Sequence, residues 1–187
     1  MSDLTAKIVA LHRALQAASL PHAFGGALAL AWCTERARGT IDIDVNIFVS
    51  IDDRDRVFDA LPEGVKVTRR DRTLLARDGQ VRVWWDDTPL DLFLNTTDYH
   101  TEVADRIRPE RFAGTRIPFL SCLDVAVFKA FFNRTKDWAD LEEMLAAGTL
   151  DTDRVAAIIA EYLGADDERV RRLVNLEPSQ APSDRSR

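Results

Sequence analysis

The sequence predicts a mixed α and β domain, of the α/β or α+β class, followed by a small C-terminal helical bundle. Helical and strand patterns alternate in the first part, whereas apolar residues recur only at helical spacing from residue 121 onward. The chain has 187 residues, which suffices for one domain with a small appendage. We therefore expect a sheet domain over 1–120, a helical subdomain over 121–175 and a disordered, Pro- and Ser-rich tail over 176–187.

The first predicted elements surround a glycine pair. Apolar residues at helical spacing predict a helix over 3–19, which ends before Pro21. Residues 22–24 form a short predicted strand that leads into Gly25-Gly26. The following segment, ALALAWC, is apolar throughout, which favours a buried helix, although a buried strand has the same composition.

A clear strand pattern covers 41–49, where apolar and mostly polar residues alternate strictly. Beyond it, a helix is predicted over 54–61. The remaining predicted elements are strands at 65–67, 73–76, 81–85 and 90–94, a hairpin turn at Asp78-Gly79, and helices from 121, over 136–146, over 152–163 and over 166–174.

Composition excludes several classes of protein. The net charge of −6 excludes a strongly basic coat for nucleic acid. No apolar run approaches the ~20 residues of a membrane span, and the first residues do not resemble a signal peptide. Cys33 and Cys122 stand apart without a CxxC pattern, so we expect reduced thiols in a cytoplasmic protein without a membrane partner.

The segment Asp42-Ile43-Asp44 carries the strongest chemical signal. Two residues apart on a strand, both carboxylates point to the same face, roughly 7 Å apart. A solvated strand face accounts for such a pair equally well. However, the opposite face is β-branched throughout, so the strand is anchored in a core and fixes two oxygen ligands for a hard divalent cation.

Asp91 lies between leucines in the predicted strand PLDLFL. A carboxylate there either faces water on an edge strand or needs a partner. If this strand pairs with residues 41–49, three carboxylates converge, which suits two Mg²⁺ ions about 4 Å apart and displacement at phosphorus.

Gly25-Gly26 stands between a predicted strand and a predicted helix. A helix start presents backbone N–H groups and the positive end of the helix dipole, and glycine lets a phosphate approach closely. The fifteen residues from Gly26 to the acidic pair allow the same phosphate to reach both.

These segments resemble a known family. FGGALAL with RGTIDIDVNIFV resembles the signature of polymerase-β-like nucleotidyltransferases, and DVAVFKAFFNRTKDWADLEEML resembles a segment of the MenT- and AbiEii-type nucleotidyltransferase toxins. The resemblance covers residues 20–147 and implies a nucleotidyltransferase-fold mixed sheet with flanking helices. From the length of the chain we expect no large C-terminal substrate-binding domain of the kind found in that family.

The resemblance also implies roles for single residues. It places a group of residues near the nucleotide and its phosphates, namely Gly25, Gly26, Thr40, Lys129 and Arg134. It makes Asp42 and Asp44 the metal-binding catalytic pair and Asp91 a third metal ligand. It makes Lys129 and either Asp137 or Asp140 catalytic as well.

The residues themselves leave alternatives open in this second motif. Lys129 is the only charge in VAVFKAFF, so its amine either reaches the surface or meets an anion. Asp137 also fits the ordinary role of an acidic residue at a helix N-terminus.

Three further features concern a nucleic-acid partner. Residues 66–77 hold five basic residues and one Asp, and residues 106–116 hold four basic residues and one Glu, for local charges of +4 and +3. They are either ordinary surface charge or a groove for RNA phosphates. In Trp84-Trp85 one ring is expected in the core, and the other is a candidate for stacking on a base.

We therefore expect a nucleotidyltransferase that uses Mg²⁺, or Mn²⁺, to move a nucleoside monophosphate from an NTP to an acceptor hydroxyl. The resemblance makes the acceptor the 3′ end of tRNA or another RNA and the protein the toxin of a toxin–antitoxin system, with an antitoxin protein or a regulatory kinase as partner. Phosphorylation of Thr40 beside Asp42 would block nucleotide binding. The alternatives are transfer to an antibiotic or metabolite, and a relative that binds a nucleotide or partner without chemistry.

Overall fold

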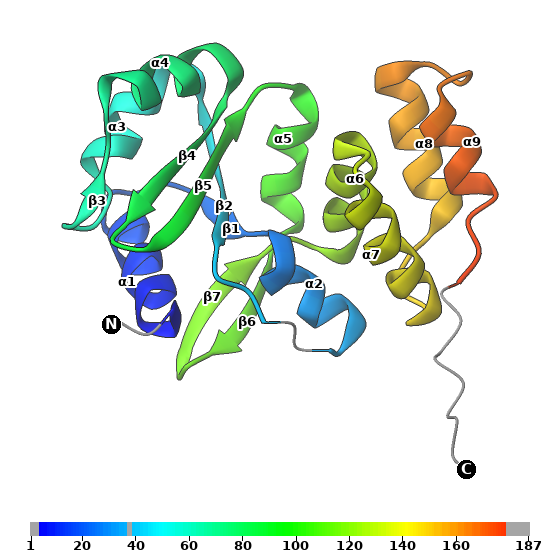
Figure 1. The fold of residues 1–187 in the computed structure, drawn as a ribbon, viewed down its shortest axis with the longest axis horizontal. Helices are drawn as coiled ribbons and strands as arrows, with labels where there is room; N and C mark the ends of the chain where they lie inside the picture. Colours follow the sequence, from blue (N-terminus) through cyan, green and yellow to red (C-terminus); the bar gives the residue numbers. More distant parts are fainter. Residues whose placement is uncertain (1–3, 37–38, 179–187) are drawn as a thin grey trace. The chain divides into compact units, whose positions relative to one another are not determined.

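The computed structural model describes residues 4–36 and 39–178. Their residues group into two compact units, one made of Met1–Ala29 and Arg38–Ser121 and the other of Leu30–Ala37 and Cys122–Arg187. The predicted class of a mixed sheet with helices, followed by C-terminal helices, is confirmed (Figure 1). The predicted division at residue 120 stays a prediction, and most of the predicted disordered tail lies outside the described residues.

The first unit is built on one mixed sheet. In the described part of the chain it has seven strands in the order β3-β4-β5-β2-β1-β7-β6, and β2 runs parallel to β5 but antiparallel to β1. The strands are β1 His22–Phe24, β2 Ile43–Ser50, β3 Val65–Lys66, β4 Gln80–Trp85, β5 Thr88–Asn95, β6 Arg108–Phe112 and β7 Thr115–Phe119.

Helices and short 3-10 turns connect these strands, and four more helices follow them. Those of the first unit are α1 Leu4–Ala17, the start of α2 Gly26–Thr34, η1 Ile51–Asp53, α3 Arg54–Asp59, α4 Arg69–Asp78, α5 Asp98–Val103 and η2 Ala104–Arg106. Those after the sheet are α6 Cys122–Phe132, α7 Thr135–Ala146, α8 Thr152–Leu163 and α9 Glu168–Val174. None of the helices in the described part of the chain is long and apolar enough to span a membrane.

One face of the sheet is a continuous apolar layer. Because side chains alternate along a strand, every second residue of β2, β4 and β5 points into the same core. Its buried members are Ile43, Val45, Ile47, Val81, Val83, Trp85, Leu90, Leu92 and Leu94. This layer fixes the register of the three strands, since a slip by one residue would expose the whole set. Ile41 lies before β2 and is 79% exposed, so the strand begins later than predicted.

The prediction of a strand at 73–76 and a hairpin turn at Asp78-Gly79 was wrong, because these residues belong to α4. The helix begins with a capping box, in which Thr68 and Asp71 each accept a hydrogen bond from the other's backbone N–H. Gly79 ends the helix with a φ of 67°, and its N–H donates to the Leu75 carbonyl oxygen at 3.0 Å. The strand hairpin of β6 and β7 and the helix α5 were not predicted.

A buried histidine pair joins α1 to β1. His22 Nδ1 donates to the Leu20 carbonyl oxygen at 2.8 Å, so its Nε2 accepts from His12 Nδ1 at 2.9 Å. Burial is the main cause that lowers the pKa of His22, to about 4, and it also lowers the pKa of His12. At neutral pH the His22 side chain is therefore uncharged.

The second unit packs its helices around Trp138, Leu141, Met144, Val155, Ile159 and Leu173, all of which are fully buried or nearly so. The expectation of reduced thiols was wrong, because Cys33 and Cys122 form a disulfide across 89 residues of sequence. The spacing of two isolated cysteines carries no signal for such a pairing. The Cys33 carbonyl oxygen also accepts a hydrogen bond from Thr149 at 2.9 Å.

Candidate active site

The glycine pair forms the junction between β1 and α2. The Gly25 N–H donates to the Asp44 carbonyl oxygen at 2.9 Å, and the Gly25 carbonyl oxygen accepts the first helical bond, from Ala29, at 3.1 Å. Gly26 has a φ of 54°, which disfavours any other residue. A Cβ atom there would also overlap the carboxylate of Asp44, so the close approach of Asp44 to the helix start requires glycine.

Asp42 and Asp44 border the start of β2. Asp44 is the second residue of the strand, with its carboxylate against Gly26. Asp42 precedes the strand, and its Oδ1 accepts a hydrogen bond from Thr40 Oγ1 at 2.5 Å. Thr40 also donates to the Asp42 carbonyl oxygen at 3.3 Å, which holds this turn in place. The carboxylate of Asp44 is therefore not turned away from the glycine pair.

Asp91 stands beside Asp44 in the sheet. The two residues are register partners on the parallel strands β5 and β2, so the pairing on which the convergence of the carboxylates depends is present. Neighbouring strands lie about 4.8 Å apart, which brings both carboxylates to the same face of the sheet. The next strand places Arg82 opposite Asp91. Arg82, Asp91 and Asp44 therefore form one row across β4, β5 and β2.

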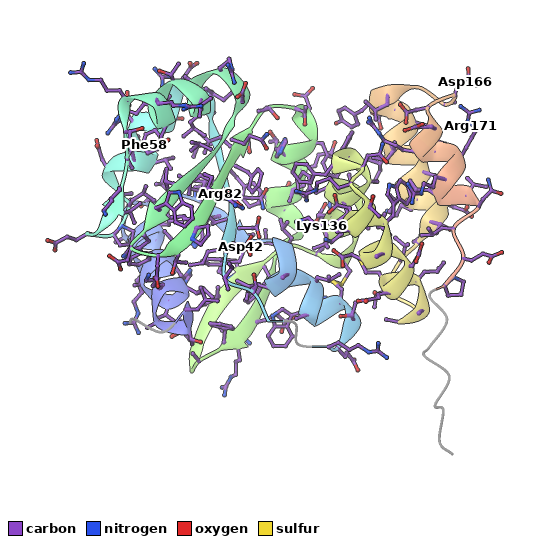
Figure 2. The ribbon with its side chains drawn as sticks, in the orientation of Figure 1. Asp42, Phe58, Arg82, Lys136, Asp166 and Arg171 are labelled. Carbon is purple, nitrogen blue, oxygen red and sulfur yellow. A yellow bond between two sulfur atoms is a disulfide. The ribbon has the colours of Figure 1, made fainter. Side chains whose placement is uncertain are left out.

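Arg82 forms ion pairs with Asp91 in this row and with Asp42, which precedes β2; Figure 2 labels Arg82 and Asp42. Its Nε and Nη2 donate to the two carboxylate oxygens of Asp91, at 2.7 and 2.5 Å. Its Nη2 lies 3.5 Å from Asp42 Oδ2. The hydrogen bonds to Asp91, followed by the charges of Asp91, Asp42 and Asp44, raise the pKa of Arg82 above its ordinary value. Asp91 and Asp42 thus both pair with one guanidinium group, and the charge of Asp44 acts on it as well.

The donor set of Asp42 and Asp44 fits a hard divalent cation. Carboxylate oxygens are the ligands that Mg²⁺ prefers, and Mg²⁺ is usually held by one or two carboxylates together with substrate phosphates. Asp91 differs, because both of its oxygens accept from Arg82. Within residues 4–36 and 39–178, no three His, Cys, Asp or Glu side chains are placed to share one ion. The role of Asp91 as a metal ligand stays a prediction.

Trp84 lies on the same face of β4 as Arg82. Side chains two residues apart on a strand share a face, and Trp84 is 48% exposed, whereas Trp85 is buried in the apolar layer. Lys66 on β3 and Pro89 on β5 are its register partners. An exposed indole beside the acidic row is available for stacking on a planar group.

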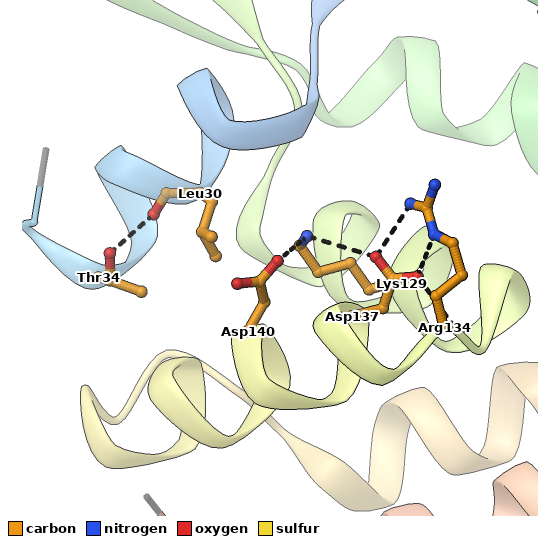
Figure 3. Close-up of polar contacts among 6 residues, drawn as sticks. All are labelled: Leu30, Thr34, Lys129, Arg134, Asp137 and Asp140. Carbon is orange, nitrogen blue, oxygen red and sulfur yellow. Dashed lines mark hydrogen bonds and ion pairs between the residues drawn. The ribbon is translucent and has the colours of Figure 1, made fainter. Parts of the chain in front are cut away.

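A second group of predicted residues lies together in the second unit (Figure 3). Lys129 Nζ lies 2.5 Å from Asp140 Oδ2 and 3.9 Å from Asp137 Oδ1. Arg134 donates from Nε and Nη2 to Asp137, at 2.7 and 3.0 Å, and its backbone N–H donates to the same carboxylate. Asp137 is thus a buried capping residue of α7, and the anions that Lys129 meets are these two carboxylates. The nucleotide-binding roles of Lys129 and Arg134 stay predictions.

The chain is similar in fold to a number of solved structures, among them the following three. The antibiotic-resistance factor ANT(2″)-Ia in solution aligns with a TM-score of 0.58 and 16% identity, over 84% of this chain and 90% of that one. Its crystal structure in complex with adenylyl-2″-tobramycin aligns with a TM-score of 0.56 and 18% identity, over 85% and 94%. An antigenic nucleotidyltransferase-like protein from Paracoccidioides brasiliensis aligns with a TM-score of 0.53 and 12% identity, over 95% and 94%.

The chain has a nucleotidyltransferase fold. No protein-family model matches it, and no curated protein matches it by sequence. At these identities the likeness shows the fold alone, and it does not distinguish the MenT- and AbiEii-type toxins from other proteins of this fold.

Within this nucleotidyltransferase fold, the structure brings together Gly26, Thr40, Asp42, Asp44 and Asp91, which the sequence singled out. Sequence reasoning missed Arg82. The signal was present, since only Asp86 and Asp87 separate β4 from β5, and a two-residue hairpin loop fixes which residues face each other.

Both predicted basic segments lie in the first unit. Most of residues 66–77 lie in α4, where Arg72 pairs with Asp55 and Arg77 with Asp78. Residues 106–116 run from the end of η2 into the β6–β7 hairpin, in which the exposed Arg111 and Arg116 are direct register partners. Like charges directly opposite each other destabilise a strand pair, so this position favours an anion.

Proposed function

We propose that this protein is a divalent-metal-dependent nucleotidyltransferase that moves a nucleoside monophosphate from an NTP to an acceptor hydroxyl. The observation that carries the proposal is the carboxylate of Asp44 packed on Gly26, at the first residue of α2 and two residues from Asp42. A helix start that receives phosphate groups and an acidic pair that receives a cation thereby meet at one place.

Different residues of the chain bind the phosphates, hold the cation and orient its ligands. The backbone N–H groups of the first turn of α2 bind phosphate oxygens, and Gly26 leaves room for their approach. Asp42 and Asp44 would hold the cation, with Thr40 fixing the carboxylate of Asp42. When bound, Mg²⁺ neutralises charge on the phosphates and favours the ionised form of the attacking hydroxyl.

The transfer balances without a further reactant. The acceptor oxygen forms a bond to the α-phosphorus, and the bond from that phosphorus to the oxygen bridging to the β-phosphate breaks. Pyrophosphate leaves with the electron pair, and the hydroxyl proton goes to bulk water. Positioning and charge neutralisation supply most of the rate in such reactions.

For the acceptor we favour the 3′ end of tRNA, with the protein acting as a toxin that an antitoxin protein restrains. The support is the pair Arg111 and Arg116 on the β6–β7 hairpin and the exposed Arg69 and Arg70 on α4, all within the unit that carries the acidic row. Arginine clusters of this kind bind phosphate backbones even on an acidic protein. The resemblance of the second motif to MenT- and AbiEii-type toxins points the same way.

A small hydroxylated molecule is the second candidate acceptor. It is favoured by the likeness to ANT(2″)-Ia, which was crystallised with adenylyl-2″-tobramycin. A protein that binds a nucleotide or a partner without chemistry is the third reading.

Transfer assays separate these readings. The protein is incubated with Mg²⁺ and each α-³²P-labelled NTP in turn, with total tRNA or with tobramycin. Label on tRNA that trimming of the 3′ end removes supports the first acceptor, and label on tobramycin supports the second. Asp42→Asn should lower the rate at least roughly a hundredfold, because charge stabilisation of this kind contributes several kcal/mol. The exposed Asp59→Asn is the matched control and should leave it unchanged. Binding of an NTP with no transfer to any acceptor would contradict enzymatic function.

Thr40 offers a point of regulation within this proposal. Its hydroxyl donates to Asp42 Oδ1 at 2.5 Å, so a phosphate on Thr40 would remove that bond and bring about −1.5 to −2 charges to the acidic pair. A kinase acting on Thr40 would then switch the protein off. Thr40→Glu should lose NTP affinity while Thr40→Ser keeps it, and equal affinities in the two variants would contradict this role.

A further inference from the structure

Arg82 contacts the carboxylates of Asp91 and Asp42 in different ways. It forms two hydrogen bonds to Asp91, at 2.7 and 2.5 Å, whereas its distance to Asp42 Oδ2 is 3.5 Å. A paired, parallel geometry of this kind orients both planar groups and is among the strongest side-chain contacts. The contact to Asp42 is an attraction between charges without a hydrogen bond. Asp42 thus keeps oxygen lone pairs for a ligand, and Asp91 directs its own to Arg82.

The guanidinium group occupies this position in the structure. Arginine stays protonated at any physiological pH, and two hydrogen bonds hold the guanidinium group on Asp91. The side chain of Asp91 is 15% exposed, so this carboxylate is shielded from water and depends on its partner. A cation that used Asp91 as a ligand would first have to displace Arg82.

This inference rests on the proposed function. Three converging carboxylates fit two divalent cations, and we infer that in this protein Arg82 takes the place of one of them. The site then binds a single divalent ion, at Asp42 and Asp44. Arg82 is a positioning residue, which acts through Asp91 and supplies a fixed positive charge beside that ion.

The charge balance of the site agrees with one ion. Asp42, Asp44 and Asp91 carry −3 and Arg82 carries +1, which leaves −2 around the guanidinium group. One divalent cation balances this charge. With two divalent cations, the four side chains and the ions together would have a net charge of +2 before the substrate phosphates bind.

Counting Mn²⁺ ions tests this inference apart from activity. Mn²⁺ is titrated into the full-length protein, and free Mn²⁺ is measured by electron paramagnetic resonance. We expect one ion per chain that Asp42→Asn removes. Arg82→Gln should add a second ion, and the double variant Arg82→Gln/Asp91→Asn should lose it again, because the added ion uses the released carboxylate of Asp91. The exposed Arg70→Gln lowers the net positive charge equally and should leave the count at one.

A second variant keeps the inference testable if Arg82→Gln does not fold. Asp91→Asn leaves Arg82 in place and removes only the third carboxylate, so the count should stay at one. Loss of the ion in Asp91→Asn would overturn the inference. Two Asp42-dependent ions in the unaltered protein would also overturn it, and so would an unchanged ion count in a folded Arg82→Gln protein. Absence of any Asp42-dependent Mn²⁺ binding would overturn the proposed function together with the inference. One Asp42-dependent ion without a gain in Arg82→Gln would overturn the inference alone.

Discussion

Replacing Gly26 with alanine should damage both the stability and the cation site, and the two effects can be separated. The φ of 54° at this position costs an alanine roughly 1–2 kcal/mol relative to glycine. The new Cβ would also overlap the Asp44 carboxylate and lie 3.1 Å from Asp44 Cβ. Forcing extra volume into a packed position costs a further ~1–3 kcal/mol. We therefore expect a total loss of about 2–5 kcal/mol.

Gly114 provides the matched control. It lies in the same unit, has a φ of 77°, and a Cβ there would meet nothing within 4 Å. Gly114→Ala should therefore lose only the backbone cost of roughly 1–2 kcal/mol. The difference between the two variants isolates the contact with Asp44.

Urea unfolding of both variants gives the two free energies, and Mn²⁺ titration gives the effect on the cation. Because Asp44 must turn its carboxylate away, Gly26→Ala should weaken Mn²⁺ binding at least roughly tenfold, whereas Gly114→Ala should not change it. Equal stability losses with equal Mn²⁺ affinities would refute the reasoning, since they would mean that Asp44 does not depend on the glycine.

Three further predictions concern the rest of the molecule. Unfolding raises the pKa of His22 from about 4 to about 6.5, so the unfolded chain binds an extra proton as the pH falls from 6.5 towards 4. Acidification over this range should therefore lower the free energy of unfolding by up to about 3 kcal/mol. An equally steep pH profile of urea unfolding in His22→Gln would contradict this. Lys129→Met should cost about 3–5 kcal/mol in thermal unfolding because it takes away the ion-pair partner of the buried Asp140, and the double variant with Asp140→Leu should recover much of it; a double variant as unstable as the single one would argue against the ion pair. Reducing the Cys33–Cys122 disulfide, which closes a loop across 89 residues, should lower the free energy of unfolding by about 4 kcal/mol, and a Cys33→Ser/Cys122→Ser protein should show no response to the reductant.

The order of β1, glycine pair, α2 and β2 could be predicted because each element there has a strong local signal. Alternation over eight residues defines β2, and the glycine pair marks the turn. At 73–76 the local signal failed, since four residues do not distinguish the two periods. The capping box of Thr68 and Asp71 and the terminal Gly79 decide for a helix, and these lie outside that window. The sequence therefore predicted β2, where the pattern is long, and failed at 73–76, where the pattern covers four residues.

The second motif shows a different limit. The resemblance assigned catalytic roles to Lys129 and to either Asp137 or Asp140, and the structure brings all three side chains together. What the spacing does not contain is their burial, with Asp137 at 1% and Asp140 at 9% side-chain exposure. A variant that removes Lys129 changes the stability of the helices as well as any nucleotide contact. Loss of transfer in Lys129→Ala alone therefore does not identify a catalytic lysine.

The acidic row shows how a site is composed across strands rather than along the chain. Asp44 and Asp91 are 47 residues apart, and their contact depends on the parallel pairing of β2 with β5. The partner of Asp91 depends on the two-residue loop that places Arg82 opposite it. Lengthening that loop by one residue would shift the register, turn Arg82 to the apolar face and leave three carboxylates without their guanidinium. The loop after β4 thus decides the charge of the site, although it contributes no side chain to it.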